Sequence, residues 1–173
     1  MGARFRSTVV ALSLLSLAPT GAAAVDGFVA LDVGGSFYSP SLAFGLEGGV
    51  RWGRWGLIAK VEVNPWFSLQ EKRSLKPGAL NVGIGAEVSY FDGRVRTAVL
   101  AGTSTLLFGT ALDKKGKTGL SVDIIAVTLR WPVHPNVVLR LDPCTLHVVM
   151  PVIDRIPLLL LEYRHTFSVE VPF

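Results

Sequence analysis

Apolar and polar residues alternate along most of the chain with a period of two. From Trp55 to Val63, every second residue is apolar, and Lys60 and Glu62 occupy positions between them. Successive side chains of a strand point to opposite faces, so this pattern predicts a strand with one apolar and one polar face. The same alternation, with no charge on the apolar face, recurs in five further segments, at residues 27–37, 42–52, 79–90, 95–105 and 158–173.

Two other segments are less regular. Between residues 120 and 131 the apolar positions change parity, which predicts a β-bulge near Ile124 or Ile125. Residues 136–149 alternate as well, but they contain Pro143, which has no amide proton for a ladder hydrogen bond and therefore disfavours a central strand. With both segments counted, the pattern predicts about eight strands, and no helical period follows the N-terminal segment.

Strand length and the spacing of the connections indicate where such strands would lie. Most of the segments exceed the usual strand length of about 5 to 6 residues and reach the roughly 9 to 11 residues that a tilted strand needs to cross a bilayer. Outer-membrane barrels have short periplasmic turns and longer outer loops, and with eight strands both termini lie on the periplasmic side. Most connections follow this rule, being short at residues 53–54, 92–94 and 132–136 and longer at 69–78, 109–119 and 150–157. The exception is residues 38–41, a short connection where the rule expects a longer one.

These patterns predict one all-β domain over residues 25–173, a closed antiparallel up-and-down transmembrane β-barrel. Residues 1–24 are predicted to be a signal peptide, because Arg4 and Arg6 precede a short apolar stretch and small residues at 22–24 fit a cleavage site. The chain has 17 Lys and Arg against 13 Asp and Glu. Two of these arginines belong to the signal peptide, so the exported chain is close to charge balance, which argues against a nucleic-acid partner.

Aromatic residues gather near the predicted strand ends. Trp and Tyr favour the two interfaces of a membrane, where their rings sit at the level of the headgroups. We therefore expect one aromatic belt at the end with the short turns and another at the end with the long loops. The first comprises Trp52, Trp55, Tyr90 and Trp131, and the second comprises Trp66 and Phe67.

The last strand carries the pattern that suggests a family. Phe167, Val169, Val171 and Phe173 occupy every second position up to the last residue of the sequence, and Ser168 and Glu170 lie between the first three. Together with the strand arrangement, this resembles the small eight-stranded outer-membrane β-barrels of Gram-negative bacteria, the class of the OmpA transmembrane domain and OmpX. In that class, the alternating apolar residues and the final Phe form a signal that the barrel-assembly machinery reads.

The resemblance covers about residues 25–173, and it implies a monomer in the outer membrane whose partners are membrane lipids, lipopolysaccharide and, during biogenesis, the assembly machinery. It also implies that the last strand pairs with the first, near Val29 and Val169, since closure leaves no unpaired backbone edge in lipid.

The polar face of the strands is expected to line the lumen. Its two signs of charge are nearly balanced, and isolated buried charges are costly, so these side chains should form ion pairs. An eight-stranded barrel is only wide enough for side chains to fill it. The inward set comprises Asp32, Glu47, Arg51, Lys60, Glu62, Glu87, Arg96, Asp123, Arg130, Arg140, Asp142, Glu162, Arg164 and Glu170.

Two classes of function are compatible with such a barrel. The first is a non-enzymatic envelope protein that is structural or binds a surface partner, with a packed lumen or a narrow solute conduit. Basic segments at residues 71–76 and 113–117 could then meet lipopolysaccharide phosphates. The second is an enzyme that modifies lipid A, for which His147 and His165 are the candidate bases and Thr145 shares the face of His147.

Catalysis is the weaker interpretation, because a nucleophile needs a base within hydrogen-bond reach and no His-x-Ser sequence occurs. No catalytic residue is assigned, and no cysteine or histidine spacing suggests a metal or cofactor. A soluble lipocalin-like barrel, with the apolar face inward and the charges outward, is a third possibility that parity alone leaves open.

Overall fold

The computed structural model describes residues 25–36, 42–64, 79–106, 118–150, 152–153, 156–157 and 159–173. The predicted signal peptide, the two basic segments, Trp66 and Phe67 lie outside the described residues. The described part of the chain contains no helix that is long and apolar enough to cross a membrane.

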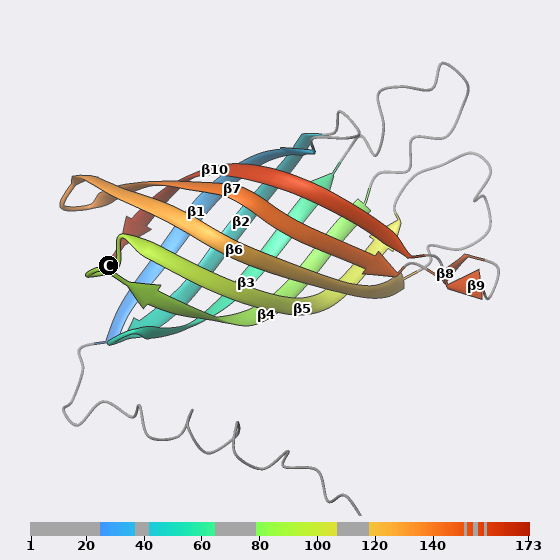
Figure 1. Ribbon diagram of the computed structural model, residues 1–173, viewed down its shortest axis with the longest axis horizontal. Coiled ribbons are helices and arrows are strands. Elements are labelled where there is room, and N and C mark those ends of the chain that lie inside the picture. Colours follow the sequence, from blue (N-terminus) through green and yellow to red (C-terminus); the bar gives the residue numbers. More distant parts are fainter. Residues whose placement is uncertain are drawn as a thin grey trace, which may run out of the picture.

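Eight strands form a closed antiparallel barrel, as the alternation predicts (Figure 1). Around the barrel the order is β1, β10, β7, β6, β5, β4, β3 and β2, so each strand pairs with its neighbours along the chain and β10 closes onto β1. The strands are β1 (Val25–Ser36), β2 (Leu42–Trp52), β3 (Trp55–Asn64), β4 (Ala79–Tyr90), β5 (Val95–Leu106), β6 (Thr118–His134), β7 (Val137–Met150) and β10 (Leu160–Pro172).

The connection between β7 and β10 differs from the prediction. It was expected to be a plain long loop, but β8 (Val152–Ile153) and β9 (Ile156–Pro157) pair there as a separate two-stranded sheet. Strands of two residues are too short to produce a recognisable period, so the sequence pattern could not reveal them.

The seam of the barrel confirms the predicted closure. Val29 pairs with Val171 and Leu31 pairs with Val169. Beyond these pairs, the amides of Gly27 and Phe173 each donate to the carbonyl oxygen of the other at 2.9 Å. Backbone hydrogen bonds therefore join β1 to β10 as far as Phe173.

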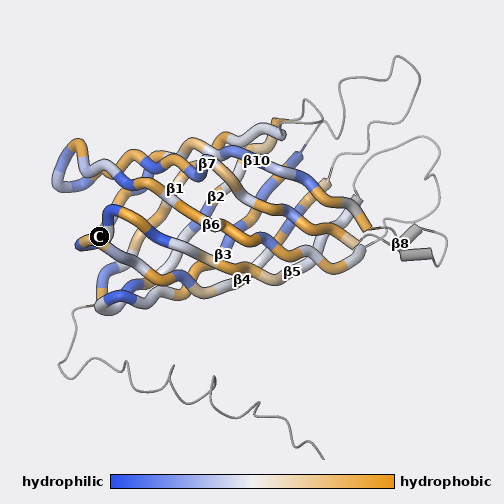
Figure 2. The backbone as a smooth tube through the Cα atoms, viewed as in Figure 1, coloured by the Kyte–Doolittle hydropathy of each residue, from blue (hydrophilic) through white to orange (hydrophobic). Residues whose placement is uncertain are grey.

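Apolar side chains lie on the outer face of the barrel and charged side chains on the inner face, as a membrane barrel requires. Hydrophobic and hydrophilic residues alternate along the barrel strands (Figure 2). Apolar side chains point outward, and Leu31 and Ile84 are 66% and 71% exposed. Charged side chains such as Glu47 and Arg140 point inward and are buried. This is the reverse of the lipocalin-like arrangement, so that alternative is wrong.

Two facing bulges in β6 and β7 change which alternate residues of these strands face the lumen. The β6 register shifts between Ile125 and Thr128, just beyond the predicted position. In β7 it shifts around Pro143 and Cys144, both of which are exposed. Because Pro143 lies in this bulge, its missing amide proton costs no ladder hydrogen bond. After the bulge, odd-numbered residues of β7 face the lumen, and His147 is one of them.

The tight turns lie together at one end of the barrel, where β1 begins and β10 ends (Figure 1). We call this the turn end, and the opposite end the loop end. Gly53 and Gly93 have φ values of 59° and 79° in two of these turns, and Phe91 and Asp92 also have positive φ. Glycine adopts this left-handed region without a steric penalty, which favours a chain reversal of so few residues.

Candidate functional site

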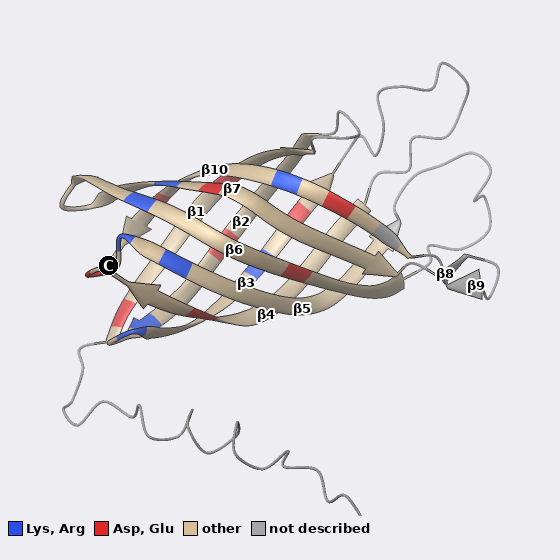
Figure 3. Cartoon of the chain, in the orientation of Figure 1, with Lys and Arg blue, Asp and Glu red and all other residues tan. Residues whose placement is uncertain are grey.

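The lumen is the one part of the described barrel in which charged side chains gather. Figure 3 shows charged residues distributed over strands all around the barrel. The structure places every member of the predicted polar set inside, buried or partly buried. Each strand contributes, with Asp32 on β1, Glu47 on β2, Lys60 on β3, Glu87 on β4, Arg96 on β5, Asp123 on β6, Arg140 on β7 and Glu170 on β10.

Six of these side chains form a closed ring across the lumen, which we call the arginine–glutamate ring. Within the ring, each glutamate contacts two arginines and each arginine contacts two glutamates. Glu47 lies 3.0 Å from Arg96 and 2.9 Å from Arg140, oxygen to nitrogen. Arg51 donates both terminal nitrogens to Glu170, at 2.7 and 3.0 Å. In order, the ring runs Arg51, Glu87, Arg96, Glu47, Arg140 and Glu170.

The ring is buried and electrically balanced. All its members except Arg51 have side chains that are at most 1% exposed. A buried charge is costly unless it is paired and hydrogen-bonded, and removing one partner leaves the other uncompensated. Because every charge in the ring has two opposite neighbours, the stability of each ion pair depends on the others.

Arg130 and Phe28 extend the ring toward the turn end. Arg130 donates to Glu170 at 2.5 Å and to the carbonyl oxygen of Gly93 at 2.7 Å, which ties the ring to the β4–β5 turn. The guanidinium of Arg51 lies over the ring of Phe28, 3.7 Å from its centroid. This cation–π contact covers one face of a cation that is only partly exposed.

A second set of ion pairs lies nearer the loop end. Glu62 accepts from Arg164 and Asn81 and lies 3.0 Å from Lys60. Arg164 also donates to Glu162 at 2.8 Å. Lys60 is in addition 3.8 Å from Asp32. We call Asp32, Lys60, Glu62, Glu162 and Arg164 the loop-end cluster.

His147 lies in the lumen, a position that the sequence analysis did not assign to it. Its side chain is buried, and Nδ1 contacts Asp123 Oδ1, its cross-strand partner on β6. Thr145 Oγ1 and His147 Nε2 are both buried without a hydrogen-bond partner, so they do not contact one another. His165 is exposed on the outer face. Thr145 and His147 therefore do not form the nucleophile–base contact that covalent catalysis needs.

Metal binding receives no support from the described residues, among which no three His, Cys, Asp or Glu side chains are grouped to hold an ion.

The predicted aromatic and assembly residues lie on the outer surface. At the turn end, Tyr90 and Trp131 are exposed, and Trp52 and Trp55 are partly buried. Trp66 and Phe67, the expected second belt, fall outside the described residues. The four residues of the expected assembly signal all point outward, namely Phe167, Val169, Val171 and Phe173.

Comparison with known proteins gives the fold. No protein-family model and no curated protein matches the sequence. The N-terminal β-barrel domain of Pseudomonas aeruginosa OprF superposes with a TM-score of 0.54 at 11% identity, over 86% of this chain and 97% of that one. The Yersinia pestis outer-membrane protein Ail gives 0.51 at 14% identity, over 87% and 100%. The chain thus has the fold of the small eight-stranded outer-membrane β-barrels.

Proposed function

We propose that the protein is an integral outer-membrane barrel that is closed to solutes and serves the envelope as a structural or surface-binding element. The arginine–glutamate ring carries this proposal. It joins β2, β4, β5, β7 and β10 across the lumen, and its members are almost entirely buried. A lumen of eight strands has little room beyond its own side chains, so a buried ring across it leaves no continuous aqueous path.

The outer surface supports a position in the membrane. Soluble monomers rarely expose large continuous apolar patches, whereas outer-membrane barrels carry an outward apolar band flanked by aromatic residues. Here Leu31, Ile84 and Leu161 are at least 60% exposed in three different strands. Tyr90 and Trp131 lie at the turn end of this surface. The fold is shared with Ail, which is an outer-membrane protein.

Several partners follow from this proposal. Membrane lipids cover the apolar band. The protein is a monomer, so lipid surrounds this band on all sides. The assembly machinery recognises Phe173 and the alternating residues before it. The basic segments 71–76 and 113–117 meet lipopolysaccharide phosphates, which is the surface-binding part of the proposal. No catalytic step is assigned to the barrel.

Ion conductance tests the closed lumen. The refolded protein in planar bilayers should show no stepwise current. The double variant Glu47→Ala with Arg140→Ala removes one negative and one positive side chain of the ring, so it opens space while keeping charge balance. We expect this double variant to conduct. Currents through the unaltered protein as large as those through the double variant would contradict the proposal.

A charge on the outer face tests the position in the membrane. Ile84 lies in the middle of β4 and is 71% exposed, whereas Val25 lies at the start of β1 and is 67% exposed. In a bilayer, Ile84→Arg should destabilise the barrel by about 2 to 4 kcal/mol and Val25→Arg by about 0 to 1 kcal/mol. Urea unfolding in lipid vesicles, followed by tryptophan fluorescence, measures both. Equal effects would indicate that the outer face does not sit in lipid.

A further inference from the structure

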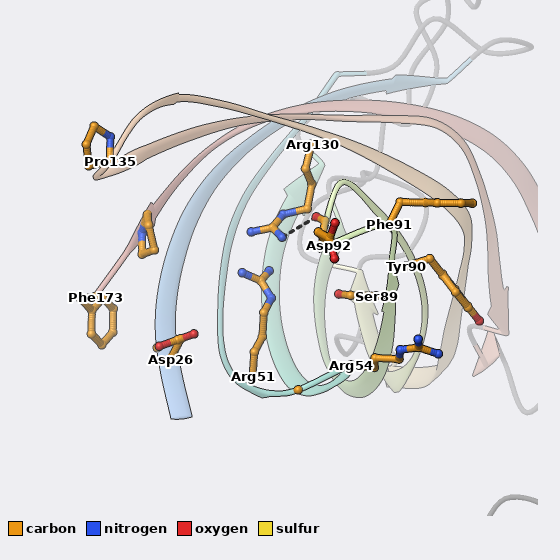
Figure 4. A pocket seen from close by; sticks show the side chains of 14 residues that line it. Asp26, Arg51, Arg54, Ser89, Tyr90, Phe91, Asp92, Arg130, Pro135 and Phe173 are labelled. Carbon is orange, nitrogen blue, oxygen red and sulfur yellow. Dashed lines mark hydrogen bonds between the residues drawn. The ribbon is translucent and has the colours of Figure 1, made fainter. Parts of the chain in front are cut away.

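A cavity of about 850 Å³ opens at the turn end of the barrel, beside the arginine–glutamate ring (Figure 4). The charged residues of its lining are Arg51, Arg54, Arg130, Asp26 and Asp92, so positive charges exceed negative ones by one, and Ser89 adds a hydroxyl. Figure 4 shows the side chains of Arg51 and Arg130 reaching toward each other across this space. The cavity is thus a cationic recess with a volume large enough for a small molecule.

Two guanidinium groups are held against a single oxygen atom in this recess. Arg51 Nη1 and Arg130 Nη2 both contact Oε1 of Glu170, at 2.7 and 2.5 Å. Arg140 Nη1 contacts the other oxygen of Glu170, at 3.3 Å. Three arginines therefore share one carboxylate, and Arg51 and Arg130 lie side by side. Like charges so close repel, and a second anion beside them would relieve that repulsion.

Arg130 is the least compensated of the three. Arg51 also pairs with Glu87, and Arg140 also pairs with Glu47. For Arg130, the described contacts are Glu170 and the carbonyl oxygen of Gly93. Its Nε is buried and has no hydrogen-bond partner. Arg130 lines the cavity with one carboxylate partner, whereas Arg51 and Arg140 each have at least two, so an additional anion would stabilise Arg130 the most.

We propose that this cavity binds a phosphate group between Arg51 and Arg130. A guanidinium presents several donors in a planar fork that matches the oxygens of phosphate, and such charge-assisted hydrogen bonds are among the strongest in proteins. The hydroxyl of Ser89, which also lines the cavity, supplies a further donor. The phosphate comes either from a soluble ion or ester or from a phospholipid headgroup.

The carboxylates of Asp26 and Asp92 line the same cavity and oppose the binding of an anion. We choose Asp92 for the test. It lies on the exposed β4–β5 turn, where its φ of 54° suits asparagine equally well. Asp92→Asn therefore removes a negative charge without straining the turn. This substitution should tighten phosphate binding, whereas loss of Arg130 should weaken it.

The test is a titration of the barrel, refolded in dodecyl maltoside micelles, with inorganic phosphate. Calorimetry should give saturable binding with a Kd below about 1 mM. We expect Arg130→Gln to weaken binding about tenfold or more and Asp92→Asn to strengthen it. Arg94→Gln is the matched control, because Arg94 is exposed in the same turn but does not line the cavity. It should bind phosphate as the unaltered protein does, and heat-modifiable gel migration should show every variant to be folded.

Absence of saturable phosphate binding, or equal binding by the unaltered protein and a folded Arg130→Gln variant, would overturn the proposal. A folded Asp92→Asn variant provides an independent test, and weaker binding by it would count against the site. Micelles doped with phosphatidylglycerol distinguish the two sources of phosphate. If the headgroup occupies the cavity, the doped micelles should abolish the binding of inorganic phosphate. If the site takes soluble phosphate, they should leave that binding intact.

Discussion

Glu47→Gln is expected to destabilise the barrel by about 3 to 5 kcal/mol, as breaking a buried ion pair does. Glu47 bridges Arg96 and Arg140, and neither arginine has any exposed surface. Glutamine keeps the shape of the side chain but removes the negative charge between two buried cations. The loss is large because water cannot replace the missing carboxylate inside the ring.

Urea unfolding of the refolded protein in lipid vesicles measures this loss. Asp26→Asn is the control, because Asp26 is an exposed acid at the turn end and its substitution should change stability by less than about 0.5 kcal/mol. Adding Arg140→Gln to Glu47→Gln should cost less than the sum of the two single substitutions, since charge balance returns. If Glu47→Gln were as neutral as the control, the ring would not hold the barrel together.

The inward face could be predicted from sequence because it depends only on local alternation. Lys60 and Glu62 must share a face of β3 whatever surrounds them. The ring itself could not be predicted, because its contacts cross the lumen. Arg51 and Glu170 are separated by 119 positions in the chain, and their contact depends on how far neighbouring strands are staggered around the closed barrel. The alternation therefore identifies which side chains face the lumen, but not which of them form ion pairs with one another.

His147 shows where local parity fails. Asp142 and His147 both face the lumen although one number is even and the other odd, because the bulge at Pro143 lies between them. The sequence contains a signal for this bulge, since Pro143 interrupts the alternation of β7 and the apolar positions of β6 change parity in the facing segment. Treating both irregularities as one paired bulge would have placed His147 beside Asp123.

The backbones of β4 and β5 lie close together at Gly102. An ideal Cβ atom built on Gly102 would lie 1.9 Å from the carbonyl oxygen of Val82 and 2.5 Å from the Cα of Gly83. Both atoms belong to the backbone of the neighbouring strand, so no side-chain rotation can relieve the overlap. Glycine at such a position allows a sheet to curve tightly enough to close into a barrel.

Gly102→Ala should therefore prevent closure, with a loss of folding free energy above about 4 kcal/mol. Gly83→Ala is the matched control, because Gly83 is the direct partner of Gly102 on β4 and its added Cβ would lie 3.5 Å from the nearest atom. That distance is an ordinary contact, and alanine restricts the unfolded chain more than glycine does, so the control should be neutral or slightly stabilising. Refolding in micelles, followed by heat-modifiable gel migration, gives the folded fraction of each variant. Equal folded fractions would show that β4 and β5 can separate to admit the methyl group, and that their close approach at Gly102 is not required for closure.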